Sequence, residues 1–176
     1  MKLKIIALTC LMCLALASGC SKEPHYTVDF TPNPAEVDII ITTEDALYET
    51  VDGWADRLAE MAASTTSAYD SWVAEETSKE EFFEEIGQIN SKMQLLKKES
   101  DLKTEYEIEG SDSDQLRWQN LMLAYTNAKN DLNDFLVLSQ ELTSDEEIKG
   151  MYQSRVVENF PGDLELIKDY VASYSE

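Results

Sequence analysis

The stretch that decides the fold is LYETVDGWADRLAEM, residues 47–61. Its apolar residues recur in alternating steps of four and three, and the alternation continues to Trp72. This heptad spacing predicts a long helix that buries one face against other helices. Thr42 and Asp45 offer a capping pair at its start, so we expect the first helix over residues 43–76.

Two further seams of the same spacing follow. Ser78 and Glu81 match a capping box at the start of the second helix, and Gly110 is its expected end. The second seam consists of Phe82, Ile86, Ile89, Met93 and Leu96, and the third of Trp118, Leu121, Tyr125, Ala128, Leu132, Phe135 and Leu142.

The C-terminal part has weaker helical signals. Ser144 and Glu147 predict the cap of a short helix, and Pro161-Gly162 predicts a break before a last helical segment. Long helices joined by short turns lie antiparallel. We therefore expect an all-α domain over residues 43–176, an elongated antiparallel three-helix bundle with a short C-terminal helical pair.

The N-terminal part predicts export. Lys2 and Lys4 precede an apolar run over residues 5–17, and small residues then lead to Cys20. This is the layout of a secretory signal, and the run is shorter than the roughly 20 apolar residues that span a bilayer. Prolines interrupt the next segment, so we expect a tether over residues 20–42, with residues 37–41 as an extended arm against the domain.

The residues Ala17-Ser18-Gly19-Cys20 resemble the lipobox of bacterial lipoproteins, although that class more often has Leu where this chain has Ala17. The resemblance implies that residues 1–19 are cleaved as a signal peptide and that Cys20 carries acyl chains of the palmitate kind. Such chains anchor a protein in a membrane without a spanning helix. The alternative is an ordinary signal cleaved after Ala17 or Gly19, which leaves Cys20 as a free thiol.

The resemblance also implies a location in the bacterial cell envelope. Ser21 carries no clear retention signal, so we expect the outer membrane in a two-membrane cell. In a single-membrane cell, the same signal places the protein on the outer face of the plasma membrane.

The charge limits the partners. The chain has 35 acidic against 14 basic side chains, a net charge of −21, and loss of Lys2 and Lys4 makes the mature charge −23. Such a surface repels nucleic acid and anionic lipid headgroups. It serves solubility or attracts a basic protein or a cation.

Motifs for catalysis and cofactors are missing from the sequence. His25 is the only histidine and lies in the tether, and the chain has no glycine-rich phosphate loop and no nucleophile elbow. After cleavage, Cys20 is the only cysteine, so thiolate cages for zinc or copper are excluded. We expect neither enzymatic activity nor a cofactor.

Three features carry site hypotheses. Glu109, Asp112 and Asp114 supply oxygen ligands for calcium, although an N-cap at Ser111 or Ser113 explains this turn equally well. Seam tryptophans beside carboxylates predict either a packed core or a cage for an amine. The small residues Ala62, Ala63, Thr65 and Ala68 predict either close approach of a neighbouring helix or a groove for a partner.

These observations favour one function over two others. The leading hypothesis is a lipid-anchored adaptor, inhibitor or immunity-type protein that binds a basic partner. The alternatives are a lipoprotein that binds a small cation or calcium, and a structural lipoprotein that self-associates through its heptads.

The lipid anchor makes the first testable prediction. Cells fed labelled palmitate should label the native chain but not the Cys20→Ser variant, because only the cysteine sulfur can form the thioether. The variant should also leave the detergent phase in a partitioning assay. Equal label and equal partitioning of the two proteins would contradict the anchor.

Overall fold

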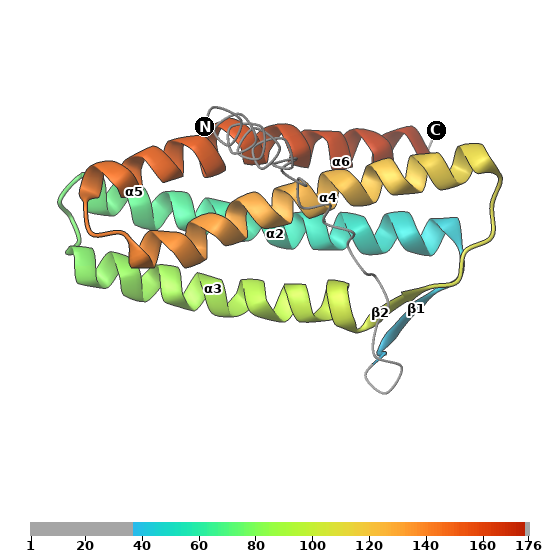
Figure 1. The fold of residues 1–176 in the computed structure, drawn as a ribbon, viewed down its shortest axis with the longest axis horizontal. Helices are drawn as coiled ribbons and strands as arrows, with labels where there is room; N and C mark the ends of the chain where they lie inside the picture. The colour runs from blue at the N-terminus through green and yellow to red at the C-terminus, as the bar shows by residue number, and fades with distance from the viewer. Residues whose placement is uncertain (1–36, 175–176) are drawn as a thin grey trace, which may run out of the picture.

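The structure is a computed structural model that describes residues 37–174, and these residues form an elongated helical bundle with one short two-stranded sheet (Figure 1). The elements are β1 (Ile39–Ile41), α2 (Glu44–Val73), α3 (Lys79–Leu102), β2 (Thr104–Tyr106), α4 (Asp112–Leu138), a 3₁₀ turn (Ser139–Glu141), α5 (Asp145–Tyr152), a π-helix (Gln153–Asn159) and α6 (Phe160–Tyr174). The predicted all-α class is confirmed. None of the helices in this range is long and apolar enough to cross a membrane.

Helix α2 forms where the heptad seam predicts it. Val51, Trp54 and Leu58 are buried along the face that the other helices cover. The cap is one residue later than predicted: Thr43, not Thr42, accepts a hydrogen bond from the backbone N–H of Ala46 at 3.2 Å. The seam therefore predicts the helix correctly, while the choice between two adjacent threonines needed the structure.

Helices α3 and α4 both begin with a capping box. Ser78 and Glu81 close the first turn of α3, as predicted, and Ser111 and Asp114 close that of α4. Each pair satisfies backbone donors that a helix start otherwise leaves unpaired. The second seam is buried, and so is the third from Leu121 to Phe135, which confirms both helices; Trp118 is half-buried, and Leu142 lies beyond the end of α4.

Between α3 and α4 the chain forms a strand. β2 pairs in parallel with β1, so that Ile39 faces Thr104 and Ile41 faces Tyr106. The predicted extended arm is thus part of a small sheet. Helix α3 ends at Leu102, before β2, so the prediction that Gly110 ends this helix is wrong.

Gly110 has a packing role beside Trp118. A Cβ at position 110 would lie 2.3 Å from Cη2 of Trp118, closer than real Cβ contacts approach. The absence of a side chain at Gly110 therefore allows the indole to lie against the backbone ahead of α4.

The C-terminal segment is helical from Asp145 to Tyr174, so the predicted break at Pro161-Gly162 is wrong. A π-helix precedes the proline, and the backbone N–H of Phe160 donates to the carbonyl of Arg155. Pro161, which has no N–H, is the second residue of α6 and follows the wider π-helical turn, and the helix continues past it. The expected short pair is one long helical segment that forms the fourth column of the bundle.

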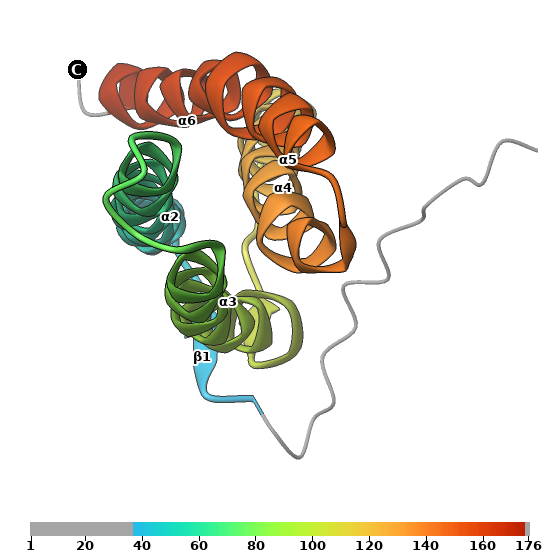
Figure 2. The same ribbon diagram turned by 90° about the vertical axis from the view of Figure 1, so that its left-hand side faces the viewer.

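The four columns do not pack equally. Helix α2 lies against α3 and α6, and α4 packs more extensively against α6 than against α3 (Figures 1 and 2). The side of the bundle between α3 and α4 is therefore the least closed, at the end where β2 joins them.

Two glycine substitutions test this packing. Gly110→Ala should lower the free energy of unfolding by about 1–3 kcal/mol, because the new methyl displaces Trp118. Gly87→Ala, where a Cβ meets nothing within 4 Å inside α3, should raise it by about 1 kcal/mol. Chemical denaturation measures both, and equal effects of the two substitutions would contradict the close approach at Gly110.

Candidate binding groove between α3 and α4

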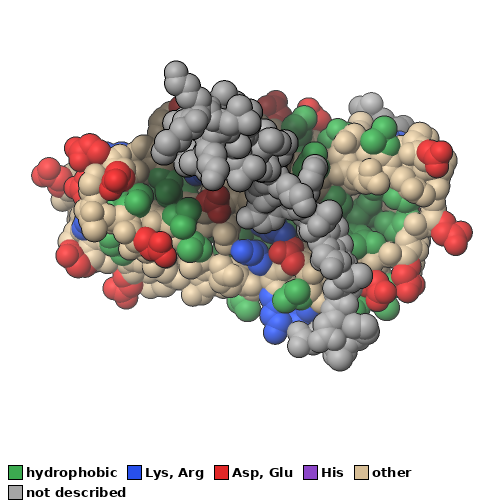
Figure 3. Space-filling model, viewed as in Figure 1, with side chains coloured by type: hydrophobic (Ala, Val, Ile, Leu, Met, Phe, Trp, Pro, Cys, Tyr) green, Lys and Arg blue, Asp and Glu red, His purple; other side chains and the backbone are tan. Residues whose placement is uncertain are grey.

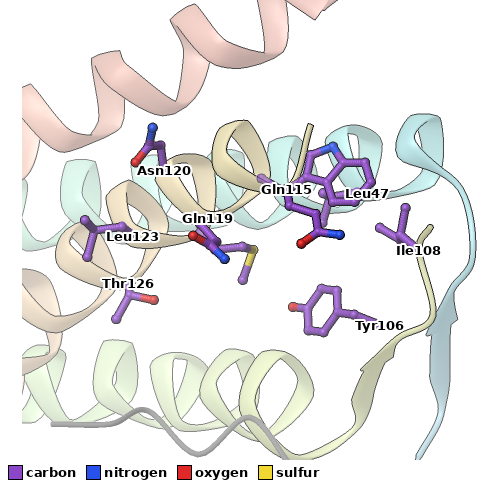
Figure 4. A pocket seen from close by; sticks show the side chains of 10 residues that line it. Leu47, Tyr106, Ile108, Gln115, Gln119, Asn120, Leu123 and Thr126 are labelled. Atoms are coloured by element: carbon purple, nitrogen blue, oxygen red, sulfur yellow. The ribbon is translucent and has the colours of Figure 1, made fainter. Parts of the chain in front are cut away.

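The open side of the bundle contains a groove of about 540 Å³, a volume typical of binding pockets (Figure 4). It lies between the start of α2, the β2 segment and one face of α4. No residue that lines it is charged, although the chain carries 35 acidic side chains. The lining residues are Leu47, Tyr106, Ile108, Gln115, Trp118, Gln119, Asn120, Met122, Leu123 and Thr126.

Secondary structure positions the aromatic walls of the groove. The pairing of Tyr106 with Ile41 holds the tyrosine at the end of β2. The indole of Trp118 donates a hydrogen bond from Nε1 to Oε1 of Glu44 at 2.9 Å, which links α4 to the first turn of α2. These contacts hold both rings in place before any ligand arrives.

The Tyr106 hydroxyl has an unusual environment. Its oxygen is buried and makes no hydrogen bond within the described residues. Burial raises the pKa of the Tyr106 phenol well above its ordinary value, and the negative charge of Asp101 raises it further. An unpaired buried hydroxyl costs about 1–3 kcal/mol, so the Tyr106 hydroxyl lowers the free energy of unfolding.

A partly buried ion pair lies near this tyrosine. Lys129 of α4 donates hydrogen bonds to the carboxylate of Asp101 and, at 3.5 Å, to the hydroxyl of Ser100. Burial lowers the pKa of the Lys129 amine, while Asp101 opposes that shift. Its ammonium also lies 5.1 Å from the centre of the Tyr125 ring. Since Lys129 is held by Asp101, this cluster joins α3 to α4 and leaves the groove itself neutral.

Acidic side chains are exposed next to groove residues in the chain. Glu107 and Glu109 are exposed on either side of Ile108, and Asp112 is exposed at the start of α4. Figure 3 shows hydrophobic side chains in a hollow on this face, with acidic side chains at the nearby end of the bundle. We call Glu107, Glu109 and Asp112 the acidic rim.

The predicted calcium ligands are used differently. Asp114 accepts hydrogen bonds from the Ser111 backbone and hydroxyl and pairs with Arg117 at 2.5 Å. These bonds lower the pKa of the Asp114 carboxyl. Asp112 and Glu109 join it in no cluster of three metal-ligating side chains, and residues 37–174 contain no such cluster. The N-cap interpretation at Ser111 is the one that the structure shows.

The small residues of α2 let a neighbouring helix approach. Thr65 and Ala68 are buried, and Ala62 and Ala63 line a shallow hollow of about 500 Å³ beside the π-helix and α6. The nearby Thr66 hydroxyl lies 3.0 Å from Oη of Tyr152. Close helix packing thus accounts for most of this segment, and the hollow is what remains open.

The seam tryptophans divide between core and groove. Trp54 and Trp72 are buried in the core, Trp54 against Tyr125 and Trp72 against Phe82, as the core interpretation predicts. Trp118 lines the groove. The lipobox residues Ala17, Ser18, Gly19 and Cys20 lie outside the described residues.

Sequence reasoning missed the groove, although a signal was present. Residues 104–109 read TEYEIE, a strict alternation that predicts a strand with Thr104, Tyr106 and Ile108 on one face. The predicted helix end at Gly110 instead places this stretch in the second helix. The alternation would have placed Tyr106 and Ile108 toward the domain.

Comparison of the chain with known protein families, curated proteins and solved structures finds no match.

The unpaired hydroxyl leads to a stability prediction. Tyr106→Phe should leave the free energy of unfolding unchanged or raise it by about 1 kcal/mol, because it removes an unsatisfied buried group. Tyr152→Phe is the matched control and should lower it by about 1 kcal/mol, because it removes the bond to Thr66. A loss at Tyr106 as large as that at Tyr152 would show that the Tyr106 hydroxyl has a partner.

Proposed function

We propose that this chain is a lipid-anchored extracytoplasmic protein that binds a basic partner protein and catalyses no reaction. The observation that carries the proposal is the charge pattern of the groove. An uncharged, largely apolar groove occurs on a strongly acidic protein, and the exposed carboxylates of the acidic rim lie close to its residues in the chain. Apolar contacts supply affinity at such a surface, and the surrounding charge selects and steers the partner.

The anchor part of the proposal rests on Cys20 and the lipobox resemblance. Acyl chains on Cys20 would hold the protein in the outer membrane of a two-membrane cell or on the outer face of a single membrane. The proline-containing segment after Cys20 would then join the anchor to the bundle.

The chemistry of the groove suits binding. Tyr106, Thr126 and the amides of Gln115 and Gln119 are hydrogen-bonding groups in an apolar surround. The amine of Lys129, on α4, is paired with Asp101. Uncharged hydrogen-bonding groups among apolar side chains suit contact with a protein surface. We therefore assign the groove to partner binding.

The two alternative functions have weaker support. A small cation would need carboxylates in the site, and the groove is lined by none. Self-association through this face would bring two acidic rims together, which like charges oppose.

Salt-dependent retention tests the proposal. Full-length lipoprotein in detergent is immobilised, exposed to envelope and secreted proteins, and eluted from about 50 to about 500 mM salt. We expect a basic protein to be released as salt rises. The double variant Glu107→Gln/Glu109→Gln should retain less of it, whereas Glu84→Gln/Glu85→Gln, on the exposed face of α3, should retain as much as the native protein.

Two results would contradict the proposal. One is a retained partner that is acidic or whose release does not depend on salt. The other is equal retention by both double variants, because the rim would then have no role beyond its share of the net charge.

A further inference from the structure

The groove continues into an apolar strip along α4. Leu123, which lines the groove, is 58% exposed, and Leu116 is also 58% exposed seven residues earlier. Two turns of helix separate them, so both lie on the same side of α4. The exposed apolar surface is therefore longer than the groove, and it runs toward the acidic rim at the start of α4. This shape suits an extended or helical segment better than a compact small molecule.

Charge selects among the possible occupants of this surface. A second copy of the chain would bring its own acidic rim, and nucleic acids and anionic lipids are repelled by the same carboxylates. A segment with lysine or arginine on either side of an apolar residue would place its cations against Glu107, Glu109 and Asp112. Each such pair at the edge of an interface speeds association more than it adds affinity.

The floor of the groove supplies the specific contact. The Tyr106 hydroxyl and the Gln119 amide point into the space between α4 and α3 (Figure 4). The Tyr106 oxygen is closed to solvent and makes no hydrogen bond within residues 37–174, so an acceptor that reaches it after a small turn of the ring toward the groove would recover the cost of its burial. The backbone carbonyls of a peptide are acceptors that every sequence carries.

We infer, on the basis of the proposed function, that the groove is the anchor site of the partner interface. It receives a bulky apolar side chain from a basic peptide segment, which lies along the Leu116–Leu123 strip with its lysines or arginines on the acidic rim. Tyr106 donates a hydrogen bond to this segment.

A random 12-residue phage-displayed peptide library is the probe. It is selected against the full-length lipoprotein in detergent, and the enriched peptides are synthesised for calorimetry. We expect peptides with Lys or Arg flanking an aromatic residue, Leu or Met. Leu123→Lys should weaken their binding at least about tenfold, since it places a cation in the groove. Leu95→Lys, the same change at a 66% exposed site on α3, should leave binding unchanged.

Tyr106→Phe gives a second, independent readout. It should weaken the same peptides about three- to tenfold, while the variant stays as stable as the native chain. The inference is overturned if no peptides are enriched, if the enriched peptides are acidic or lack an apolar residue, or if Leu123→Lys and Leu95→Lys behave alike.

These outcomes separate this inference from the proposed function. Basic peptides that bind Leu123→Lys as well as the native chain would place the interface elsewhere on the acidic surface. That result would keep the proposal of a basic, salt-dependent partner and reject the groove as its anchor site. A neutral dye, N-phenyl-1-naphthylamine, serves as competitor: displacement by the peptides supports a shared groove, and simultaneous binding contradicts it.

Discussion

The burial of the α2 seam is the constraint on which the rest of the structure depends. Val51, Trp54 and Leu58 form the surface that the other helices cover, and loss of any one would open the centre of the bundle. A polar contact fixes the register at this point: the Trp54 indole donates to Glu99 of α3 at 2.8 Å, beside the ion pair of Glu99 with Arg57. Although burial opposes ionisation of Glu99, the hydrogen bonds from Arg57 and Trp54 lower the pKa of its carboxyl.

The groove is a consequence of how the other helices gather on that seam. α3 and α6 lie on two sides of α2, and α4 completes the bundle mainly through α6, so the α3–α4 side closes least. β2, paired with β1, connects the two helices at one end, and the partly buried Lys129–Asp101 pair joins them. Acidic residues remain outside and apolar ones line the opening. An acidic chain thus forms a groove whose lining is uncharged.

The sequence predicts the parts of this arrangement that depend on local periodicity. The heptad steps from Leu47 to Trp72, the capping box at Ser78 and the N-cap at Ser144 locate helices, because these patterns depend on neighbours within a few turns. The break predicted at Pro161 was wrong because the effect of a proline depends on the turn before it, which here is a π-helix. The groove could not be predicted, because it depends on the pairing of β1 with β2, two strands that lie over sixty positions apart in the chain. No local pattern reports which side of a bundle stays open.

The central claim is that the Leu123 face of α4 contacts a basic partner while the protein is anchored at its membrane. Photo-crosslinking in living cells measures this directly, with benzoylphenylalanine incorporated at position 123 and, separately, at position 95. The account predicts that irradiation joins a single basic protein to the position 123 derivative and none to the position 95 derivative. Crosslinks of equal yield from both positions, or from position 95 alone, would contradict it.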